Sequence, residues 1–523
     1  MIKPLKPSPS EKDFLFEIDP EPAAESLTAY GGVPLVVRAW RSLGVPQSIG
    51  RQVRVKERQR GYDEGTMLES LMVLNAVGGE CLEDLERLRE DEGLAELLGH
   101  GIPSPEAARK FLYQFHSEEK IEEAKAQLEL GARAYIPAEN GPLAGLGQVN
   151  QELVQELGRR CASEKIATVD QDATIIESRK QEAQRTYEGE RGYQPMLACW
   201  AEMNVILADE FRDGNVGANQ GLLGVAQRAF RALPETVQEY YYRGDAACYE
   251  HELMDWLQDE EREGGPKGFI GFAISARMSP ELRAAVEAVP EEAWRPCREG
   301  EGDGIREWAD VAYVPSVGYE QKEKQPLRYV GLRLRPRQGE LFGDGSAVKH
   351  FAVVTNRWKL EGGKLLEWHR EKAGTIEAVH DVLKNELAAG VMPCGRFGAN
   401  AAWLRMAVLT HNVLTALKRL ALPPELLAAR PKRLRFLIFQ TAGRIVHHAR
   451  RVLLRLKGAR ERLGRMEGGV APPAPTELSG PREALWTDKR GVSNHEGKTL
   501  PEMGAVASYP GGTKLRGGAA PAS

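Results

Sequence analysis

The chain has 523 residues with a formal net charge of -5, and 42% of its residues are hydrophobic. That length supports two to four domains, each with a hydrophobic core. It contains no apolar run of about 18 residues, and its first residues lack the apolar segment of a secretion signal, so we expect a cytoplasmic protein without a membrane partner. The six cysteines are scattered, which argues against a disulfide framework or a zinc module.

The first third of the chain predicts an extended arm followed by helices. Residues 1–30 are rich in Pro and acidic side chains and predict a flexible arm. Over 31–148 apolar residues recur at helical spacing, and Ser104 with Pro105 is typical of a helix start, so we expect a helical domain. Residues 51–60 are strongly basic, which fits either phosphate contact or a solvated segment.

The middle of the chain alternates strand and helix patterns. Expected strands are 165–176, 193–199, 205–211, 239–243 and 269–274, with helices at 217–232 and 249–262. Shorter β-like segments follow at 309–314, 327–334 and 350–355. This order predicts a mixed α/β core whose first part is 149–300, interrupted by a β-rich insertion over 301–362.

The last third predicts helices and then a tail. We expect the core to resume with a helix-bearing segment at 363–400, followed by basic helices over 401–465. Residues 466–523 are crowded with Gly, Pro and Ser and predict a disordered tail.

Carboxylates mark three places where chemistry could occur. On a strand, Asp170, Asp172 and Thr174 would project from one face, which fits a metal or acid/base site or simply an acidic turn. Asp245 follows the fourth strand, where it could join Asp172 or cap a helix. Glu377 lies on a predicted helix over 371–390, on the flank of its buried stripe and in line with Arg370 and Lys384.

Several short motifs accompany these residues in a fixed order. They are Asp172-Ala173-Thr174, Tyr187-Glu188-Gly189 with Gly192-Tyr193-Gln194-Pro195, Arg212-Asp213-Gly214-Asn215, Arg243-Gly244-Asp245-Ala246, and Glu377 with Lys384 seven residues later. In this order and spacing, over about residues 60–420, the chain resembles the bacterial cut-and-paste insertion-sequence DDE transposases. Their catalytic core is ribonuclease H-like, and in one subgroup it is interrupted by a β-rich insertion.

The resemblance implies a fold and a reaction. The fold is α/β: a ribonuclease H-like mixed five-stranded sheet with helices, interrupted by the insertion and flanked by an N-terminal helical domain and C-terminal helices. By the same resemblance, the helical domain over 31–148 would be a DNA-binding domain. The catalytic and metal-binding residues would be Asp172, Asp245 and Glu377, with Asp170 in reserve. Two Mg²⁺ ions, or Mn²⁺ in their place, would support DNA strand cleavage and strand transfer.

The resemblance also implies DNA partners. These are double-stranded DNA with terminal inverted repeats and target DNA, held by a dimer on paired ends in a bacterial cell, where the bound protein would be nucleoid-associated. Residues 405–465 contain fifteen Lys and Arg against two acidic residues, a balance that favours DNA over the alternatives of acidic lipid or a protein face. The predicted DNA-binding residues are Lys384, Arg370, Lys372, Arg243, Arg212, Arg54, Lys56, Arg58, Lys432, Arg433, Arg450 and Arg451. The tyrosine that the family carries before its Glu is missing here.

Two other functions compete for the same residues. A strand ending in Asp-x-Asp-x-Thr is also typical of haloacid-dehalogenase-like phosphohydrolases, with Asp170 as nucleophile, Asp172 as acid/base and Thr174 on phosphate. A meander after the first strand does not fit their doubly wound parallel sheet. The third candidate is a catalytically decayed transposase that still binds DNA.

Overall fold

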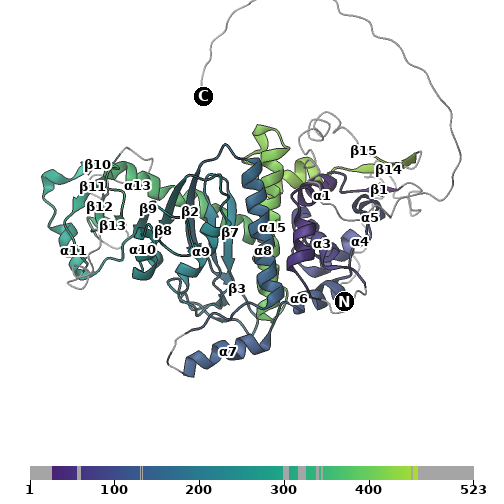
Figure 1. The fold of residues 1–523 in the computed structure, drawn as a ribbon, viewed down its shortest axis with the longest axis horizontal. Coiled ribbons are helices and arrows are strands. Elements are labelled where there is room, and N and C mark those ends of the chain that lie inside the picture. The colour runs from purple at the N-terminus through teal and green to yellow at the C-terminus, as the bar shows by residue number, and fades with distance from the viewer. Residues whose placement is uncertain are drawn as a thin grey trace, which may run out of the picture. The chain divides into compact units, whose positions relative to one another are not determined.

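The computed structural model describes most of the chain up to residue 456 (Figure 1). The described residues are 26–55, 61–129, 131, 134–297, 305–315, 326–336, 341–342, 346–448 and 451–456. The expected tail, most of the expected arm, and the predicted DNA contacts Lys56, Arg58 and Arg450 lie outside them. None of the described helices is long and apolar enough to cross a membrane.

The N-terminal part is helical, as predicted. Its helices are α1 (Val33–Ser42), α2 (Val45–Gln52), α3 (Glu64–Val77), α4 (Leu85–Arg89), α5 (Glu92–Leu98), α6 (Pro105–Tyr113), α7 (Glu118–Glu129) and α8 (Gly141–Arg160). Ser104 caps α6 by accepting a hydrogen bond from the Ala107 amide, and Pro105 is its first residue. The prediction for this helix start is therefore confirmed.

A nine-stranded mixed sheet forms the centre of the molecule. Its strands, in spatial order, are β10 (Arg295–Pro296), β11 (Ile305–Val311), β12 (Arg328–Arg335), β13 (Lys349–Thr355), β9 (Ile270–Ser275), β8 (Glu239–Gly244), β2 (Ile166–Ala173), β6 (Met196–Trp200) and β7 (Val205–Glu210). Strand β2 runs parallel to β8, and β8 runs parallel to β9, whereas β6 is antiparallel to both of its neighbours. Helices α9 (Leu222–Ala232), α10 (His251–Gln258) and α11 (Pro280–Glu287) connect or flank these strands.

The β-rich insertion extends the core sheet, which gives nine strands where five were expected. Strand β13 pairs with β9, for example Val354 with Ile274, so the hydrogen-bonded ladder crosses from core to insertion without a break. The physical reason is that β9 would otherwise be an open edge, and a paired edge satisfies its backbone groups. A small separate sheet of β3 (Ile176–Glu177), β5 (Arg191–Tyr193) and β4 (Gln184–Arg185) follows β2.

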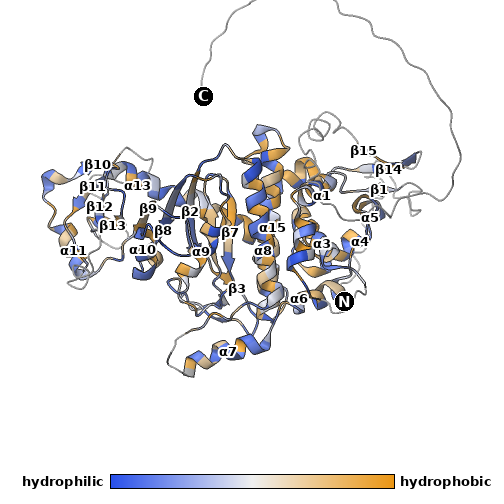
Figure 2. Cartoon of the chain, viewed as in Figure 1, coloured by the Kyte–Doolittle hydropathy of each residue, from blue (hydrophilic) through white to orange (hydrophobic). Residues whose placement is uncertain are grey.

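Helix α15 (Phe397–Leu420) is the central helix of the molecule and is buried along nearly its whole length. It packs on α1, α3, α6 and α8 as well as on β7. Figure 2 shows hydrophobic residues along β7 and the facing helices. The N-terminal helices and the sheet therefore share one continuous hydrophobic core. Helices α13 (Gly362–Arg370), α14 (Lys372–Glu386) and α16 (Pro431–Leu434) complete the described helices of this region, with a π-helical turn at Arg435–Phe439.

The prediction of helix up to residue 465 is wrong for residues 443–448 and 451–456. There the chain forms the antiparallel strands β14 (Gly443–His448) and β15 (Arg451–Leu456), and β14 also pairs with β1 (Leu27–Thr28). The pairing with β1 joins residues more than 400 positions apart, so nothing local in the sequence announces it.

Candidate active site

Strand β2 presents its two acidic residues to one helix. Asp170 accepts a hydrogen bond from the Thr375 hydroxyl and Asp172 one from Lys372 Nζ, and both donors lie on α14. Gln171 points to the opposite face, where its amide donates to the Leu222 carbonyl at the start of α9. The predicted alternation along this strand is confirmed.

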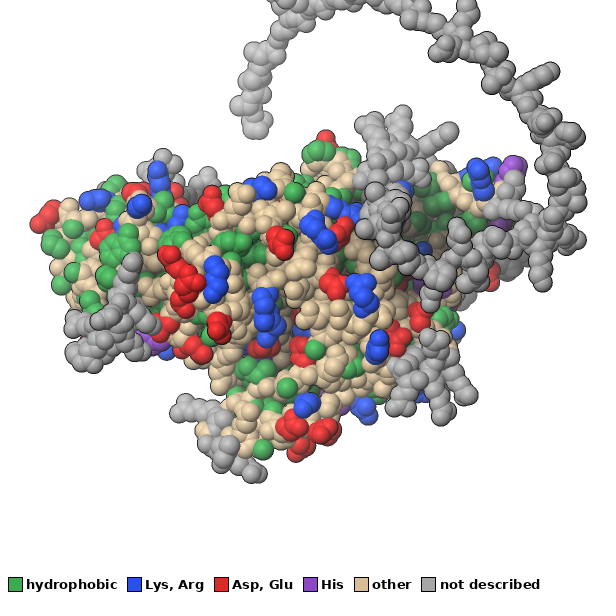
Figure 3. All heavy atoms as spheres, viewed as in Figure 1, with side chains coloured by type: hydrophobic (Ala, Val, Ile, Leu, Met, Phe, Trp, Pro, Cys, Tyr) green, Lys and Arg blue, Asp and Glu red, His purple; other side chains and the backbone are tan. Residues whose placement is uncertain are grey.

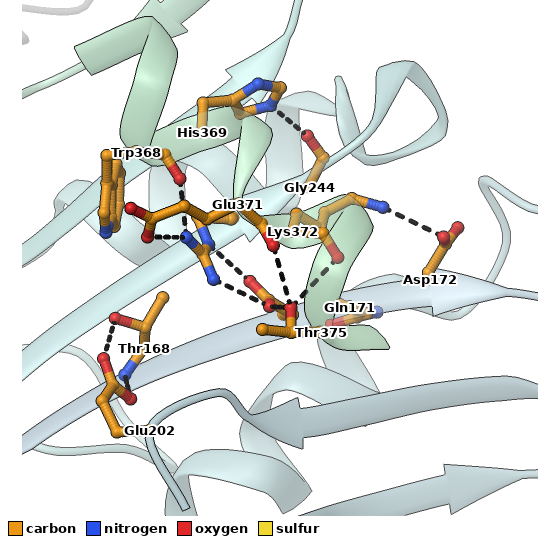
Figure 4. A network of polar contacts seen from close by, with 12 residues as sticks. Thr168, Gln171, Asp172, Glu202, Gly244, Trp368, His369, Glu371, Lys372 and Thr375 are labelled. Carbon is orange, nitrogen blue, oxygen red and sulfur yellow. Dashed lines mark hydrogen bonds and ion pairs between the residues drawn. The ribbon is translucent and has the colours of Figure 1, made fainter. Parts of the chain in front are cut away.

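Asp170 is committed to an ion pair. It is fully buried and accepts two hydrogen bonds from Arg243, at 2.7 and 2.9 Å. Arg243 is also buried, and it donates further to the Trp368 carbonyl and to Glu371 (Figure 4). These positions do not fit the reserve role of Asp170 as a metal ligand or the predicted contact of Arg243 with DNA. Neither side chain is accessible to a ligand from solvent.

Asp172 is partly exposed and faces Lys372. The ammonium of this lysine lies 3.0 Å from Asp172 Oδ2 (Figure 4). Burial lowers the pKa of Lys372, but attraction from Asp172 and Asp245 outweighs it, so that the pKa lies above its usual value. Lys372 therefore stays charged between the two carboxylates, and it is too buried to be the free DNA contact that was predicted.

Asp245 reaches the same end of the sheet from β8. Gln171 pairs with Gly244 in the parallel ladder, so Asp172 and Asp245 are the next residues on adjacent strands. Asp245 Oδ1 accepts hydrogen bonds from the amides of Ala247 and Cys248, so the prediction that Asp245 caps a helix is confirmed. Its position next to Asp172 on the adjacent strand was predicted as well. The Gly244 carbonyl accepts a hydrogen bond from His369 Nε2 at 3.0 Å; burial lowers the pKa of that histidine.

Glu377 lies one and a half turns after Lys372 on α14 and is exposed. The predicted buried stripe of this helix, Ile376, Val379, Leu383 and Leu387, is confirmed. Two turns beyond Glu377, Lys384 Nζ donates to Thr174 Oγ1 at 3.0 Å and so contacts the end of β2. Arg370 lies on the separate helix α13 rather than on α14.

A cavity of about 790 Å³ opens beside these residues. Asp245, Lys372 and Glu377 line one side of it. The insertion strands and α13 contribute the apolar side chains of Leu332, Leu334, Phe351, Val353 and Leu366, together with the charged side chains of Arg306, Glu367 and Arg370. The insertion therefore forms a wall of the candidate active site.

The carboxylates suit a divalent metal ion of the magnesium type. Asp172, Asp245 and Glu377 offer only oxygen ligands, which Mg²⁺ and Mn²⁺ prefer. A cationic group, Lys372 Nζ, already lies against Asp172, so this position favours positive charge. Among the described residues no three His, Cys, Asp or Glu side chains converge closely enough to hold a metal ion as they stand, so metal binding would require side-chain rotation.

The predicted DNA contacts fall into two classes. Arg212, like Arg243, is buried, and it pairs with Glu210 at 2.6 Å, so it belongs to the interior. The remaining described candidates that expose their charge are Arg370, Arg54, Lys432, Arg433 and Arg451, and Lys384 is partly exposed.

Two motif glycines position the small sheet after β2. A Cβ on Gly192 would collide with the Ile176 carbonyl, and one on Gly214 would lie 2.7 Å from the carbonyls of Gln184 and Gly192. Burial raises the pKa of Asp213, next to Gly214, to about 6. These motifs therefore have a structural explanation.

Sequence reasoning missed Thr375 and His369, which orient Asp170 and the backbone before Asp245. Thr375 lies two residues before Glu377, and this short spacing is the signal that could have pointed to it. No local signal marks His369, because its partner is a backbone carbonyl 125 residues away.

Comparison with known proteins identifies the family. The model of the family described as transposase DDE domain group 1 matches residues 17–460. Among solved structures, the piggyBac transposase in a synaptic complex with hairpin DNA is similar, with a TM-score of 0.40 and 10% identity over 87% of this chain and 86% of that chain. No curated protein matches the chain. Because the family model spans most of its length, the chain belongs to the transposase DDE domain group 1 family and is a DNA-cleaving transposase.

Proposed function

We propose that this transposase binds the terminal inverted repeats of an insertion sequence and uses Asp172, Asp245 and Glu377 for metal-dependent strand cleavage and strand transfer. The observation that carries the proposal is the meeting of two parallel strands at one edge. Asp172 is the last residue but one of β2 and Asp245 directly follows β8, while Glu377 on α14 lines the same cavity as Asp245.

The sheet order supports a ribonuclease H-like core. The five strands of the core lie in the order β7-β6-β2-β8-β9, with only β6 antiparallel to its neighbours. In chain order this is strand three, two, one, four, five, the arrangement expected of such a core. The first and fourth strands are adjacent in it, which is what brings Asp172 and Asp245 together.

The family implies a divalent metal ion, and we propose Mg²⁺ held by the three carboxylates. When bound, two such ions would activate the attacking oxygen and stabilise the leaving oxygen at phosphorus. Lys372 would hold Asp172 in place and keep positive charge beside the scissile phosphate. Lys384, seven residues after Glu377 on α14, would contact the DNA backbone next to the scissile phosphate.

The direct test is cleavage of supercoiled DNA that carries the ends of the element, in the presence of Mg²⁺. We expect wild type to nick at the element ends and the variants Asp172→Asn, Asp245→Asn and Glu377→Gln each to lose at least a thousandfold in rate. The matched control is Glu367→Gln, an exposed carboxylate that lines the same cavity and lies outside the trio. Equal loss in the control, or full activity in any one of the three variants, would contradict the assignment.

The phosphohydrolase alternative requires Asp170 as its nucleophile, and the structure does not leave this side chain available. Asp170 is fully buried and bonded to Arg243, so it cannot attack a phosphate ester. The antiparallel β6 next to β2 also differs from a doubly wound parallel sheet. A decayed, DNA-binding copy remains as one outcome of the cleavage test: wild type would then bind the ends without nicking them.

Paired-end chemistry implies two copies of the chain on two DNA ends, and we propose such a dimer on DNA. The exposed side chains Arg54, Lys432 and Arg433 are the described candidates for backbone contact. Lys56, Arg58 and Arg450 stay predictions from the sequence.

A further inference from the structure

The hairpin β14–β15 has two chemically different faces. In an antiparallel pair, residues directly opposite each other share a face, and successive residues alternate between faces. Ile445 lies opposite Leu454 on one face, whereas Arg444 lies opposite Arg455 and His448 opposite Arg451 on the other. The two strands together contain three Arg, two His and no acidic residue.

The first face fixes the hairpin to the protein. Ile445 is buried and lies so close to Gly93 on α5 that a Cβ there would come within 3.0 Å of it. The Nε2 atom of His447, on the same face, contacts the carboxylate of Glu96 on α5. The Ile445 amide also donates to the Ser26 carbonyl beside β1. The hairpin is therefore a docked ribbon whose orientation is set by contacts with the N-terminal helices.

The second face points to solvent and is cationic. Arg444, His448, Arg451 and Arg455 are all exposed. Among the described residues, His448, Arg451 and Arg455 make no ion pair and no side-chain hydrogen bond. Leu453, which lies between the two arginines of its strand on this face, is 40% exposed. Figure 3 shows basic and His side chains at the end of the molecule where Figure 1 labels β14 and β15.

We propose that the solvent face of the β14–β15 ribbon is a double-stranded-DNA contact that lies in a groove of the duplex. Cations placed on both strands of a ribbon repel one another, and a polyanion removes that repulsion. A two-stranded ribbon fits the major groove, and six residues at about 3.3 Å each span about 20 Å, or roughly six base pairs. Apolar Leu453 between the arginines suits contact with sugars or thymine methyl groups.

The ribbon is connected to other segments that are proposed to contact DNA. It docks on α5, within the N-terminal helices, and follows directly after the segment that carries Lys432 and Arg433. The inference rests on the proposed function only in taking duplex DNA as the ligand. It goes beyond that function by assigning a β-ribbon, rather than a helix, to grip it.

The test compares duplex binding by full-length wild type and the double variant Arg451→Gln/Arg455→Gln over 50 to 300 mM salt. The probes are a duplex from the end of the element and a random duplex of the same length. Each phosphate contact contributes about 0.9 to the slope of log affinity against log salt, so the variant should lower the slope by about 1.8 and bind both duplexes more weakly. Both side chains are exposed, so the unfolding temperature should not change.

The matched control removes the same number of positive charges from helix α7, where each lysine pairs with a glutamate. Lys120→Gln/Lys125→Gln on α7 takes away two positive charges that already pair with Glu123 and Glu122. Its slope should equal that of wild type. A ribbon variant with the wild-type slope would overturn the proposal while leaving end cleavage by wild type, and so the proposed function, intact.

A second arm separates DNA from lipid. Vesicles with and without phosphatidylserine are mixed with wild type and the ribbon variant. We expect no sedimentation of either protein with the vesicles. Charge-dependent vesicle binding that the ribbon variant loses, together with unchanged DNA binding, would assign the face to a membrane surface and overturn the DNA proposal.

Discussion

Two buried arginines are paired with carboxylates inside the protein. Arg243 bonds to Asp170, and Arg405 on α15 bonds to Asp209 and Glu139. The carboxylates of Asp209 and Glu139 raise the pKa of Arg405 despite its burial. Arg243 was a predicted DNA contact and Arg405 opens the basic stretch 405–465, but a buried, fully paired guanidinium stabilises the fold instead. Counting positive charges along the sequence cannot separate the two cases, because the partners are far away in the chain.

Replacing Arg243 should therefore affect stability before it affects DNA binding. Arg243→Met leaves Asp170 as a buried unpaired charge, which should cost about 3–5 kcal/mol in the free energy of unfolding. Chemical denaturation measures this loss. The exposed Arg370→Met, on the neighbouring helix, should cost less than about 0.5 kcal/mol. An Arg243→Met protein with wild-type stability but a reduced salt slope of DNA binding would restore the DNA role.

At the scale of elements, a partly buried acid, Asp213, lies beside the small sheet β3-β5-β4. Tyr193 at the end of β5 pairs with Asp213, whose pKa burial raises to about 6. A carboxyl that keeps its proton in the folded chain and loses it in the unfolded chain makes stability fall as pH rises. For Asp213 this window runs from about pH 4, where the unfolded group ionises, to about pH 6.

Asp213→Asn should remove that pH dependence. The variant should be more stable than wild type at pH 8, by about 2–3 kcal/mol, and should match it near pH 4. Urea unfolding at several pH values measures the difference. The exposed Asp259→Asn is the control and should follow wild type across the range. A wild-type pH profile for Asp213→Asn would show that the burial of this carboxyl has no energetic cost.

Most elements of the sheet and the Glu-bearing helix followed from the sequence because their patterns are local. Strand β7, for instance, was expected at 205–211 and spans Val205–Glu210. The hairpin β14–β15 did not follow, since Ile445, Val446 and the leucines of 451–456 satisfy a helical period about as well as a strand period. Only the pairing with β1 and the docking on α5 decide between them.

The whole molecule has a single sheet that crosses the boundary between core and insertion. The order of Asp172, Asp245 and Glu377 along the chain was enough to propose a site. It could not reveal the cavity, because the cavity wall comes from β12 and β13, whose pairing with β9 is a property of the assembled sheet.

Trp308 tests whether core and insertion unfold together. This side chain of β11 is buried in a cluster with Ala273 of β9 and Leu365 of α13, and Gly362 leaves room for its ring. Trp308→Ala should cost about 3–5 kcal/mol and lower the temperature of one single unfolding transition. Calorimetry measures it, with Trp358→Ala, 55% exposed, as the control that should change little. Two separate transitions, with only one shifted, would show an independent insertion domain.

Helix α15 has a consequence for the position at which the protein would cut DNA. Its buried length touches the N-terminal helices on one side and the sheet that carries Asp172 on the other. If the N-terminal helices hold DNA, α15 relates that DNA to the carboxylates, because the helix packs against both parts along its buried length. The number of base pairs between the sequence held and the bond cut would then be fixed by the core, as by a caliper.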